Sequence, residues 1–189
     1  MSNEILSLLK ESGAFLEGHF LLTSGRHSDK YIEKFRLMES PNHLDKICQK
    51  MSSQFSKDSV DIVLGAAIGG ILLSLGVAKY LGKKGIFTER VQEKMELRRG
   101  FEIQEGSNVL IVEDIVSTGG SIFELIEVVK QCRANVIGVT SIVHRSVEKI
   151  DFGCTYKPLL NYPVESWAES DMPKWLSEIP ITVHGRSGK

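Results

Sequence analysis

The chain has 189 residues, of which 42% are hydrophobic and 25% are charged, and its formal net charge is −1. This composition is typical of one globular domain with a sizeable core, and it gives no electrostatic reason to expect binding to nucleic acid or to a membrane. Three dispersed cysteines without a CxxC pair, and charged residues at positions 4, 10, 11 and 17, argue against a disulfide framework and a signal peptide and indicate a cytoplasmic protein.

The N-terminal part predicts a helix followed by a polar segment. Apolar residues recur with helical spacing over residues 3–12. The segment 18–29 is rich in hydroxyl, histidine and arginine side chains around Gly25, and short strands are expected on either side of it, at 20–22 and 30–35. Two interpretations stay open on composition alone, namely a solvated β-turn or a loop beside a ligand.

A strand, a glycine-rich loop and a helix follow one another in the next part of the chain. A helix that begins at Pro41 is predicted to run to about residue 55. The apolar run at 60–65 predicts a buried strand, residues 66–70 form a glycine-rich loop, and a helical pattern follows at 71–81. Such a unit can present backbone N–H groups to an anion, although a tight turn without a ligand also explains the pattern.

A charged segment separates this unit from the next one. After a short strand at 85–88, residues 89–100 (ERVQEKMELRRG) are charged and poorly periodic. This segment is either a solvated hairpin or a flap that carries cations to a polyanionic ligand, as lids do when they exclude water from a site.

The stretch with the most chemical content is VLIVEDIVSTGGS at 109–121. Four apolar residues predict a strand buried on both faces, and a helical pattern resumes at Ile122 and continues to about Cys132. The loop between them can hold a phosphate with backbone N–H groups and hydroxyls. Glu113 and Asp114 would repel a phosphate, so they are expected to bind sugar hydroxyls or a cation. The predicted ligand therefore carries a phosphate and a polyol.

The remaining pattern completes an α/β fold. A strand is predicted at 135–143, and Arg145 follows it. Shorter elements are expected near the end of the chain: strands at 157–160 and 164–167, a helical turn or two at 172–178, and a loose tail at 184–189. Alternation of strands and helices predicts one domain, 1–189, with a central, mainly parallel sheet flanked by helices. Ligands bind beyond the carboxyl ends of such strands, so 66–70, 113–121 and Arg145 are expected to meet in one cleft.

The run at 109–121 resembles the signature of the type I phosphoribosyltransferases, in which an acidic pair joins a hydrophobic strand to a Thr/Gly-rich loop. Within that family the chain is similar to the orotate phosphoribosyltransferases of the shorter bacterial and archaeal type. Three further motifs carry this narrower resemblance: GHF at 18–20 with LTSGRHS at 22–28, RRGF at 98–101, and Arg145. The resemblance implies a small N-terminal hood at 1–38 and transfer of a phosphoribosyl group from 5-phosphoribosyl 1-diphosphate (PRPP) to orotate, a step of pyrimidine biosynthesis.

The same resemblance assigns the PRPP-binding residues position by position. Glu113 and Asp114 would bind the ribose hydroxyls, and Asp114 would also stabilise charge during catalysis. The 5-phosphate would be held by the loop that follows them: Ile115, Val116, Ser117, Thr118, Gly119, Gly120 and Ser121. The diphosphate would contact Ala67 and Gly69.

The resemblance also implies catalytic cations, an orotate site, a metal ion and a second subunit. Arg90 and Lys94 would close over the diphosphate as catalytic residues, either in their own site or across the interface of a homodimer. Ser117, Arg145 and Ser24 would contact orotate. Mg2+ would be bound by diphosphate and sugar oxygens, with no ligand set made of protein side chains alone, and would assist departure of the diphosphate.

Three positions depart from the family pattern. Ser117 stands where many relatives have threonine, and Gly69 and Thr23 stand where the longer bacterial enzymes have lysine. The residue that neutralises the diphosphate is therefore left open. Two other functions also stay open: a phosphoribosyltransferase for another base, against which Arg145 and residues 22–28 argue, and a PRPP-sensing regulator, which is expected to carry a nucleic-acid module or a basic face.

Overall fold

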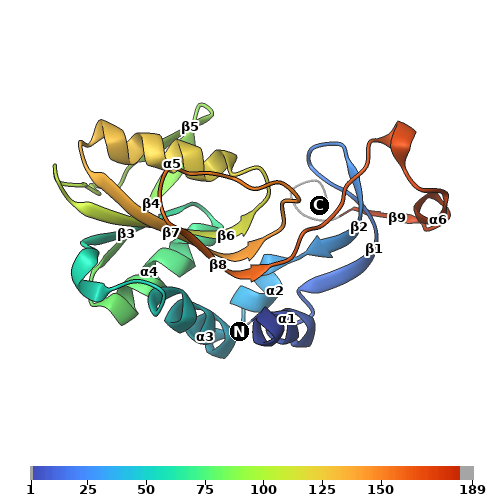
Figure 1. The fold of residues 1–189 in the computed structure, drawn as a ribbon, viewed down its shortest axis with the longest axis horizontal. Helices are drawn as coiled ribbons and strands as arrows, with labels where there is room; N and C mark the ends of the chain where they lie inside the picture. The colour runs from blue at the N-terminus through green and yellow to red at the C-terminus, as the bar shows by residue number, and fades with distance from the viewer. Residues whose placement is uncertain (1, 184–189) are drawn as a thin grey trace.

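The computed structural model describes residues 2–183, and its main layer is a six-stranded sheet in the order β5-β4-β3-β6-β7-β8 (Figure 1). Its strands are β3 (Ile62–Ala66), β4 (Lys84–Val91), β5 (Lys94–Leu97), β6 (Asn108–Val116), β7 (Asn135–His144) and β8 (Tyr156–Asn161). Neighbouring strands pair in parallel, except that β4 and β5 form an antiparallel hairpin. The prediction of a central, mainly parallel sheet flanked by helices is confirmed.

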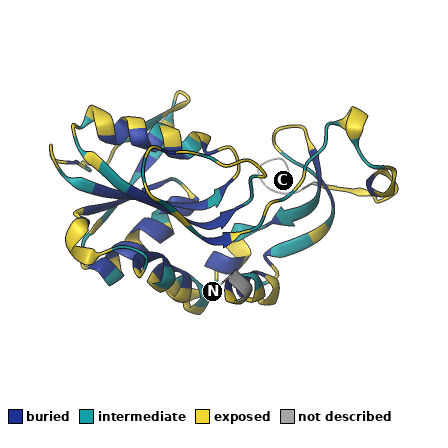
Figure 2. Cartoon of the chain, in the orientation of Figure 1, coloured by how far each residue is buried: buried dark blue, intermediate teal, exposed yellow. Residues whose placement is uncertain are grey.

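Helices cover both faces of this sheet because its inner strands are apolar on both sides. Along β6, Leu110 and Val112 pack in one hydrophobic cluster and Val109 and Ile111 in the other, as the alternation of a strand requires. The helices that close these clusters are α1 (Ser2–Glu11), α3 (Pro41–Ser52) and α4 (Gly69–Leu81) on one side and α5 (Gly120–Gln131) on the other (Figure 1). Figure 2 shows the inner strands as buried and much of the outer helix surface as exposed.

A second, three-stranded sheet lies beside this body, in the order β2-β1-β9 (Figure 1). β1 (Phe15–Leu21) and β2 (His27–Ile32) are antiparallel neighbours, and β9 (Ile181–Val183) joins β1 in parallel from the other end of the chain. The short helix α6 (Lys174–Ser177) contacts β1. Sequence patterns do not reveal β9, because three residues are too few to show the periodicity of a strand.

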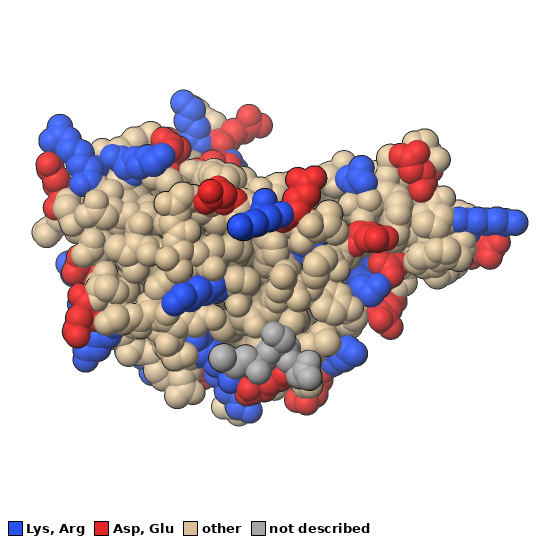
Figure 3. All heavy atoms as spheres, viewed as in Figure 1, with Lys and Arg blue, Asp and Glu red and all other residues tan. Residues whose placement is uncertain are grey.

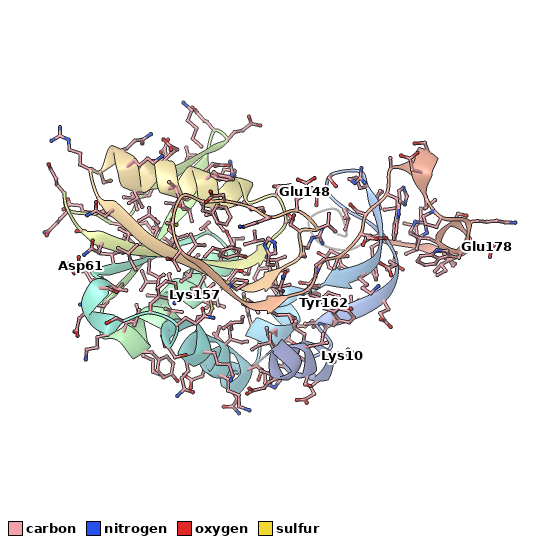
Figure 4. All side chains as sticks on the ribbon, in the orientation of Figure 1. Lys10, Asp61, Glu148, Lys157, Tyr162 and Glu178 are labelled. Carbon is pink, nitrogen blue, oxygen red and sulfur yellow. The ribbon has the colours of Figure 1, made fainter. Side chains whose placement is uncertain are left out.

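The small sheet is attached to the main body by aromatic and backbone contacts. The rings of Phe15 on β1 and Tyr162, which follows β8, meet edge to face with their centroids 5.3 Å apart; Tyr162 is labelled in Figure 4. His27 and Trp167 exchange two backbone hydrogen bonds of 2.8 Å. The segment that follows β8 therefore ties the two sheets together.

The strand predicted at 30–35 is wrong in its second half. β2 ends at Ile32, and the short helix α2 (Lys34–Met38) begins two residues later. The side chain of Glu33 accepts a hydrogen bond from the backbone N–H of Phe35 at 3.4 Å, which caps the first turn of this helix. A local cap thus ends the strand.

The strand predicted at 164–167 is also wrong, since this segment forms a single bridge and no ladder in the described chain. Side chains take the place of a partner strand here. Ser28 Oγ donates to the carbonyl of Glu165 at 2.9 Å, and the guanidinium of Arg26 donates to the carbonyl of Ser166. Side-chain donors of this kind compete with backbone pairing.

The other elements lie close to their predicted positions. The helix predicted at 41–55 ends at Ser52, the strand at 157–160 is β8, and the turn at 172–178 contains α6. Two short 3₁₀ turns, at Lys57–Ser59 and Glu169–Asp171, complete the described elements. The tail predicted at 184–189 lies outside the described residues.

The surface carries both signs of charge. On the face drawn in Figure 3, lysine and arginine side chains are interspersed with aspartate and glutamate, in keeping with the net charge of −1. Across residues 2–183, no helix combines the length and the apolar character that crossing a membrane requires.

Candidate active site

Three strand ends of the main sheet meet at one cleft of about 580 Å³. Its walls come from the small sheet and α2, from the loop before α4, from the end of β6 and from the residue after β7. The polar and small residues that line it are Thr23, Tyr31, Glu33, Lys34, Gly69, Asp114, Ser117 and Arg145. Parallel strands bring their carboxyl ends to the same edge of a sheet, which is where ligands bind in such folds.

A smaller recess of about 70 Å³ adjoins the cleft at the start of α5 and is lined by Glu113 and residues 115–122. Gly119 has a φ of +79°, and a Cβ at this position would lie 2.8 Å from the ring of Phe152, so both conformation and space favour glycine. No side chain among the described residues caps the first turn of α5, which leaves its N–H groups to a ligand. With the three hydroxyl side chains of the loop, the recess can hold one phosphate group.

The acidic pair lies inside β6 and not after it, which corrects the predicted end of this strand. Glu113 is 8% exposed and Asp114 is 4% exposed. Because successive residues of a strand face opposite ways, Glu113 borders the phosphate recess and Asp114 borders the larger cleft. Lys34 Nζ lies 2.6 Å from Asp114 Oδ2, and the N–H of Ile115 donates to Asp114 Oδ1 at 2.6 Å. These two partners hold the carboxylate of Asp114 in place.

Burial changes the protonation of Glu113. Removal from water raises the pKa of this carboxyl to about 8, and the charge of Asp114 acts in the same direction, against a smaller lowering by the Asp114 N–H and Lys34. Glu113 is therefore largely protonated at neutral pH. A neutral carboxyl group can donate a hydrogen bond and does not repel a phosphate. The electrostatic repulsion expected between the acidic pair and a bound phosphate is therefore reduced.

This pKa predicts that Glu113→Gln makes folding stability less dependent on pH. An unfolded chain loses the Glu113 proton near pH 4.5, whereas the folded protein keeps it up to about pH 8. Folding therefore takes up a proton between these values, and the group makes the wild type lose stability as pH rises, by at most about 1.4 kcal/mol per pH unit. Urea unfolding at about pH 5.5 and about pH 8 measures the effect.

The variant is expected to gain stability relative to the wild type at the higher pH, because glutamine has no proton to lose. Titrating groups away from Glu113 are shared by the two proteins, so their contributions cancel in the comparison. An equal difference in unfolding free energy at both pH values would contradict the raised pKa of Glu113.

The loop before α4, which leads into Gly69 as the first residue of this helix, is packed closely against β6. A Cβ at Gly69 would overlap Asp114 Oδ2, so this position accepts no side chain without a shift. Gly69 borders the main cleft, whereas Ala67 borders a neighbouring hollow of about 650 Å³ that also contains Arg90. Ile68 lines both hollows, so the loop forms the wall between them.

The charged segment 89–100 forms a hairpin, which is the simpler of its two interpretations. β4 and β5 are joined by a tight turn whose two residues have positive φ. Arg90 on β4 donates to Glu124 Oε1 on α5 at 2.9 Å. Lys94 is exposed at the start of β5 and lines none of the hollows described above. The structure thus brings Arg90, but not Lys94, to the edge of the site.

Arg145 follows β7 and borders the cleft near Tyr31. Its backbone N–H donates to the carbonyl of Val116 at 2.8 Å, which fixes it to the end of β6. Burial lowers the pKa of its guanidinium. Within the described part of the chain, no carboxylate lies within ion-pair distance of this group. A half-buried cation without a protein counterion is suited to an anionic group on a ligand.

Two residues near the cleft differ from the sequence-based expectation. Ser24 is exposed in the turn between β1 and β2 and does not line the cleft, whereas its neighbour Thr23 does. The sequence pattern does not single out Lys34. The helix that begins there is only five residues long, and its first residues are predicted as the end of a strand. Its position just after the hydroxyl-rich segment is the one signal that could have marked it.

Comparisons with known proteins find relatives of similar sequence and fold. A model of the phosphoribosyl transferase domain matches residues 37–178. A curated protein named orotate phosphoribosyltransferase from Thermoanaerobacter sp. (strain X514) is 42% identical over 182 residues, which cover 96% of each chain. A protein of the same name from Thermotoga maritima is 41% identical over 184 residues, 97% of this chain and 98% of the other. A crystal structure of orotate phosphoribosyltransferase from Aeropyrum pernix superposes with a TM-score of 0.71 at 25% identity, over 83% of this chain and 93% of that one.

Proposed function

The chain belongs to the phosphoribosyl transferase family, and we propose that it transfers the 5-phosphoribosyl group from PRPP to orotate, giving orotidine 5′-phosphate and diphosphate in pyrimidine biosynthesis. Relatives named orotate phosphoribosyltransferase are about 40% identical to it over nearly the full length of both chains. The observation that carries the choice of base is Arg145, whose guanidinium has no carboxylate partner among the described residues and borders the same cleft as Asp114. A planar fork of this kind suits the carboxylate of orotate.

The hollows of the site can take the parts of PRPP in order. The 5-phosphate would lie in the recess at the start of α5, and the ribose hydroxyls would then face Asp114. The diphosphate would lie against the loop before α4, toward the hollow that contains Arg90. Orotate would occupy the remaining part of the cleft, between Ser117 and Arg145 and beneath the small sheet.

The reaction requires positioning and electrostatics, and it needs no nucleophilic side chain. The bond between C1 of the ribose and the diphosphate oxygen breaks, and its electron pair leaves with the diphosphate. C1 then bonds to N1 of orotate, and the proton on N1 passes to water or to an oxygen of the departing diphosphate. Asp114 would stabilise the positive charge that develops on the sugar, and the recess and Arg145 would hold the two reactants in line.

Magnesium belongs to this proposal as a partner of the substrate. Among residues 2–183, no group of three or more His, Cys, Asp or Glu side chains is arranged to hold a metal ion. The cleft offers the carboxylate of Asp114, and one or two carboxylates together with substrate phosphates and water are the donors that Mg2+ prefers. Bound in this way, Mg2+ would neutralise charge on the departing diphosphate.

A homodimer interface on α4 is a further part of the proposal. Ile68, Leu72 and Leu75 follow one another at helical spacing and are 70%, 40% and 53% exposed. An apolar row of this kind on a surface is typical of a contact between subunits. Because Ile68 also lines the cleft, a partner subunit on α4 would border the site. Action of the partner's Lys94 in this site, which the family resemblance implies as one of two arrangements, is part of the same proposal.

Leu75→Asp is expected to convert this dimer into monomers, because it places a charge in an apolar contact. Sedimentation velocity at micromolar concentration should give twice the chain mass of 21.0 kDa for the wild type and the chain mass for the variant. Val147→Asp is the matched control, since Val147 is an exposed apolar residue away from α4 and its variant should stay dimeric. A monomeric wild type would contradict the interface.

The thiols support a location in the cytoplasm. The cysteines Cys48, Cys132 and Cys154 are all free, and Cys48 is buried. Free thiols of this kind fit a reducing compartment.

The function is tested by following orotate absorbance in the presence of PRPP and Mg2+. We expect orotate to be consumed only when PRPP and Mg2+ are both present, and adenine, xanthine and uracil to be poor substrates in the same mixture. Preferential use of another base would assign a different phosphoribosyltransferase activity. Binding of PRPP without turnover of any base at micromolar enzyme would indicate a regulator.

A further inference from the structure

We propose that Lys34 is the cation that neutralises the diphosphate leaving group, in place of a side chain on the loop before α4. This inference rests on the proposed function and adds a catalytic residue to it. Lys34 is the first residue of α2, and it lines the main cleft together with Asp114 and Gly69. Its ammonium therefore lies where the sugar-binding strand and the diphosphate loop approach each other.

The contact of Lys34 with Asp114 places its charge. The ammonium Nζ lies 2.6 Å from Asp114 Oδ2, and the side chain of Lys34 is 32% exposed while that of Asp114 is 5% exposed. The carboxylate is thus fixed within the protein, and the ammonium reaches it from the open side of the cleft. A lysine ammonium is a compact charge with three rotatable donors on a flexible stem, so it can move between acceptors a few ångströms apart.

Gly69 explains why the charge comes from α2 and not from the loop. A Cβ at this position would overlap Asp114 Oδ2 and would lie 3.4 Å from Lys34 Nζ. A side chain here would displace the carboxylate of Asp114 from its present position, and the ammonium of Lys34 lies beside the backbone of Gly69 instead. A diphosphate held by this loop would lie next to that ammonium.

Lys34 differs from the other cations near the site because its partner, Asp114, is itself expected to bind the substrate. Within the described chain, the main cleft is lined by two basic side chains, Lys34 and Arg145. Arg145 follows β7 and lies near Tyr31, where the pyrimidine is expected. In the neighbouring hollow, Arg90 is paired with Glu124, and Arg99 is paired with a glutamate of β4. Among the described residues of one subunit, Lys34 is thus the basic side chain beside Gly69 whose carboxylate partner is itself expected to bind substrate.

Substrate binding gives Lys34 a reason to change partners. The ribose hydroxyls are expected to donate hydrogen bonds to the carboxylate of Asp114. These bonds would replace the contact that the ammonium of Lys34 makes with this carboxylate. At the same time PRPP brings several negative charges to the loop before α4. Lys34 is therefore expected to turn from Asp114 toward the diphosphate, where a charge-assisted hydrogen bond strengthens as the leaving group gains charge.

The experiment measures binding of inorganic diphosphate and of ribose 5-phosphate to Lys34→Gln by calorimetry with Mg2+ present. We expect the dissociation constant for diphosphate to rise by at least about tenfold, since one charge-assisted contact is lost. The constant for ribose 5-phosphate should change by less than about threefold, because the recess and Asp114 remain. Lys34→Arg should keep most of the affinity for diphosphate. Lys30→Gln is the matched control, since Lys30 pairs with Asp29 and does not line the cleft.

Two results would overturn the assignment. If Lys34→Gln weakened the binding of both ligands equally, the role of Lys34 would be limited to orienting the carboxylate of Asp114. Unchanged diphosphate affinity would remove Lys34 from the diphosphate site. The binding measurements need no turnover, so a wild type that binds both ligands but does not consume orotate would sink the proposed function and leave this test of Lys34 valid.

Discussion

Asp114→Asn is expected to lower kcat by a factor on the order of 10²–10³, because it removes the carboxylate that faces the ribose in the main cleft. The substitution keeps the size of the side chain and one oxygen, so the hydrogen bond from the N–H of Ile115 can persist. What is lost is the negative charge, which pairs with Lys34 and would offset the positive charge on the sugar during bond cleavage. Initial rates of orotate consumption measure the effect. The KM for PRPP should change less than kcat, because the phosphate recess is untouched.

A second aspartate provides the control for this substitution. Asp61 precedes β3 and accepts a hydrogen bond from the N–H of Asn108 at 2.8 Å, at the end of the sheet opposite the site; it is labelled in Figure 4. Asp61→Asn keeps an oxygen acceptor in the same way and is expected to leave kcat within about twofold. Thermal unfolding should first show that both variants are folded. Wild-type kinetics in a folded Asp114→Asn would then contradict the placement of the site.

The parts of this fold that depend on local chemistry could be predicted from the sequence. The stretch 109–121 contains an apolar run, small hydroxyl residues and glycines in the order that builds a strand, a phosphate-binding turn and a helix. Each of these features acts through neighbours in the chain. Gly119, for example, is needed for its own positive φ as well as for the nearby ring of Phe152. The sequence of this stretch alone therefore predicts the strand, the turn and the helix.

The parts that depend on contacts between distant segments could not be predicted. β9 exists because β1 offers it an edge, and the segment near Trp167 stays irregular because Ser28 and Arg26 occupy its carbonyl groups. The position of the Lys34 ammonium depends on its ion pair with Asp114. These two residues are 80 positions apart in the sequence, so no local pattern predicts the pair. The raised pKa of Glu113 likewise follows from burial, which a sequence pattern shows only indirectly.

Arg145→Gln is expected to lower kcat/KM for orotate by a factor on the order of 10²–10³, and to affect orotate more than any base without a carboxylate. The guanidinium is half-buried and has no carboxylate partner among the described residues. Its removal therefore does not leave a carboxylate of the protein unpaired. The loss falls on the ligand, where a desolvated, charge-assisted contact to the carboxylate of orotate contributes roughly 2–5 kcal/mol. Steady-state kinetics with orotate and with uracil, at saturating PRPP, separate the two bases.

The ratio between orotate and uracil is the decisive quantity in this comparison. Uracil lacks the carboxylate, so its low kcat/KM should hardly change in the variant, and discrimination in favour of orotate should collapse. Arg145→Lys keeps the charge without the planar fork and should give an intermediate loss. Arg133→Gln is the matched control, because Arg133 makes an exposed ion pair with Glu105 and is remote from the cleft. Equal losses for both bases in Arg145→Gln would assign this residue to PRPP or to the shape of the cleft, and orotate would then have to be recognised by another group.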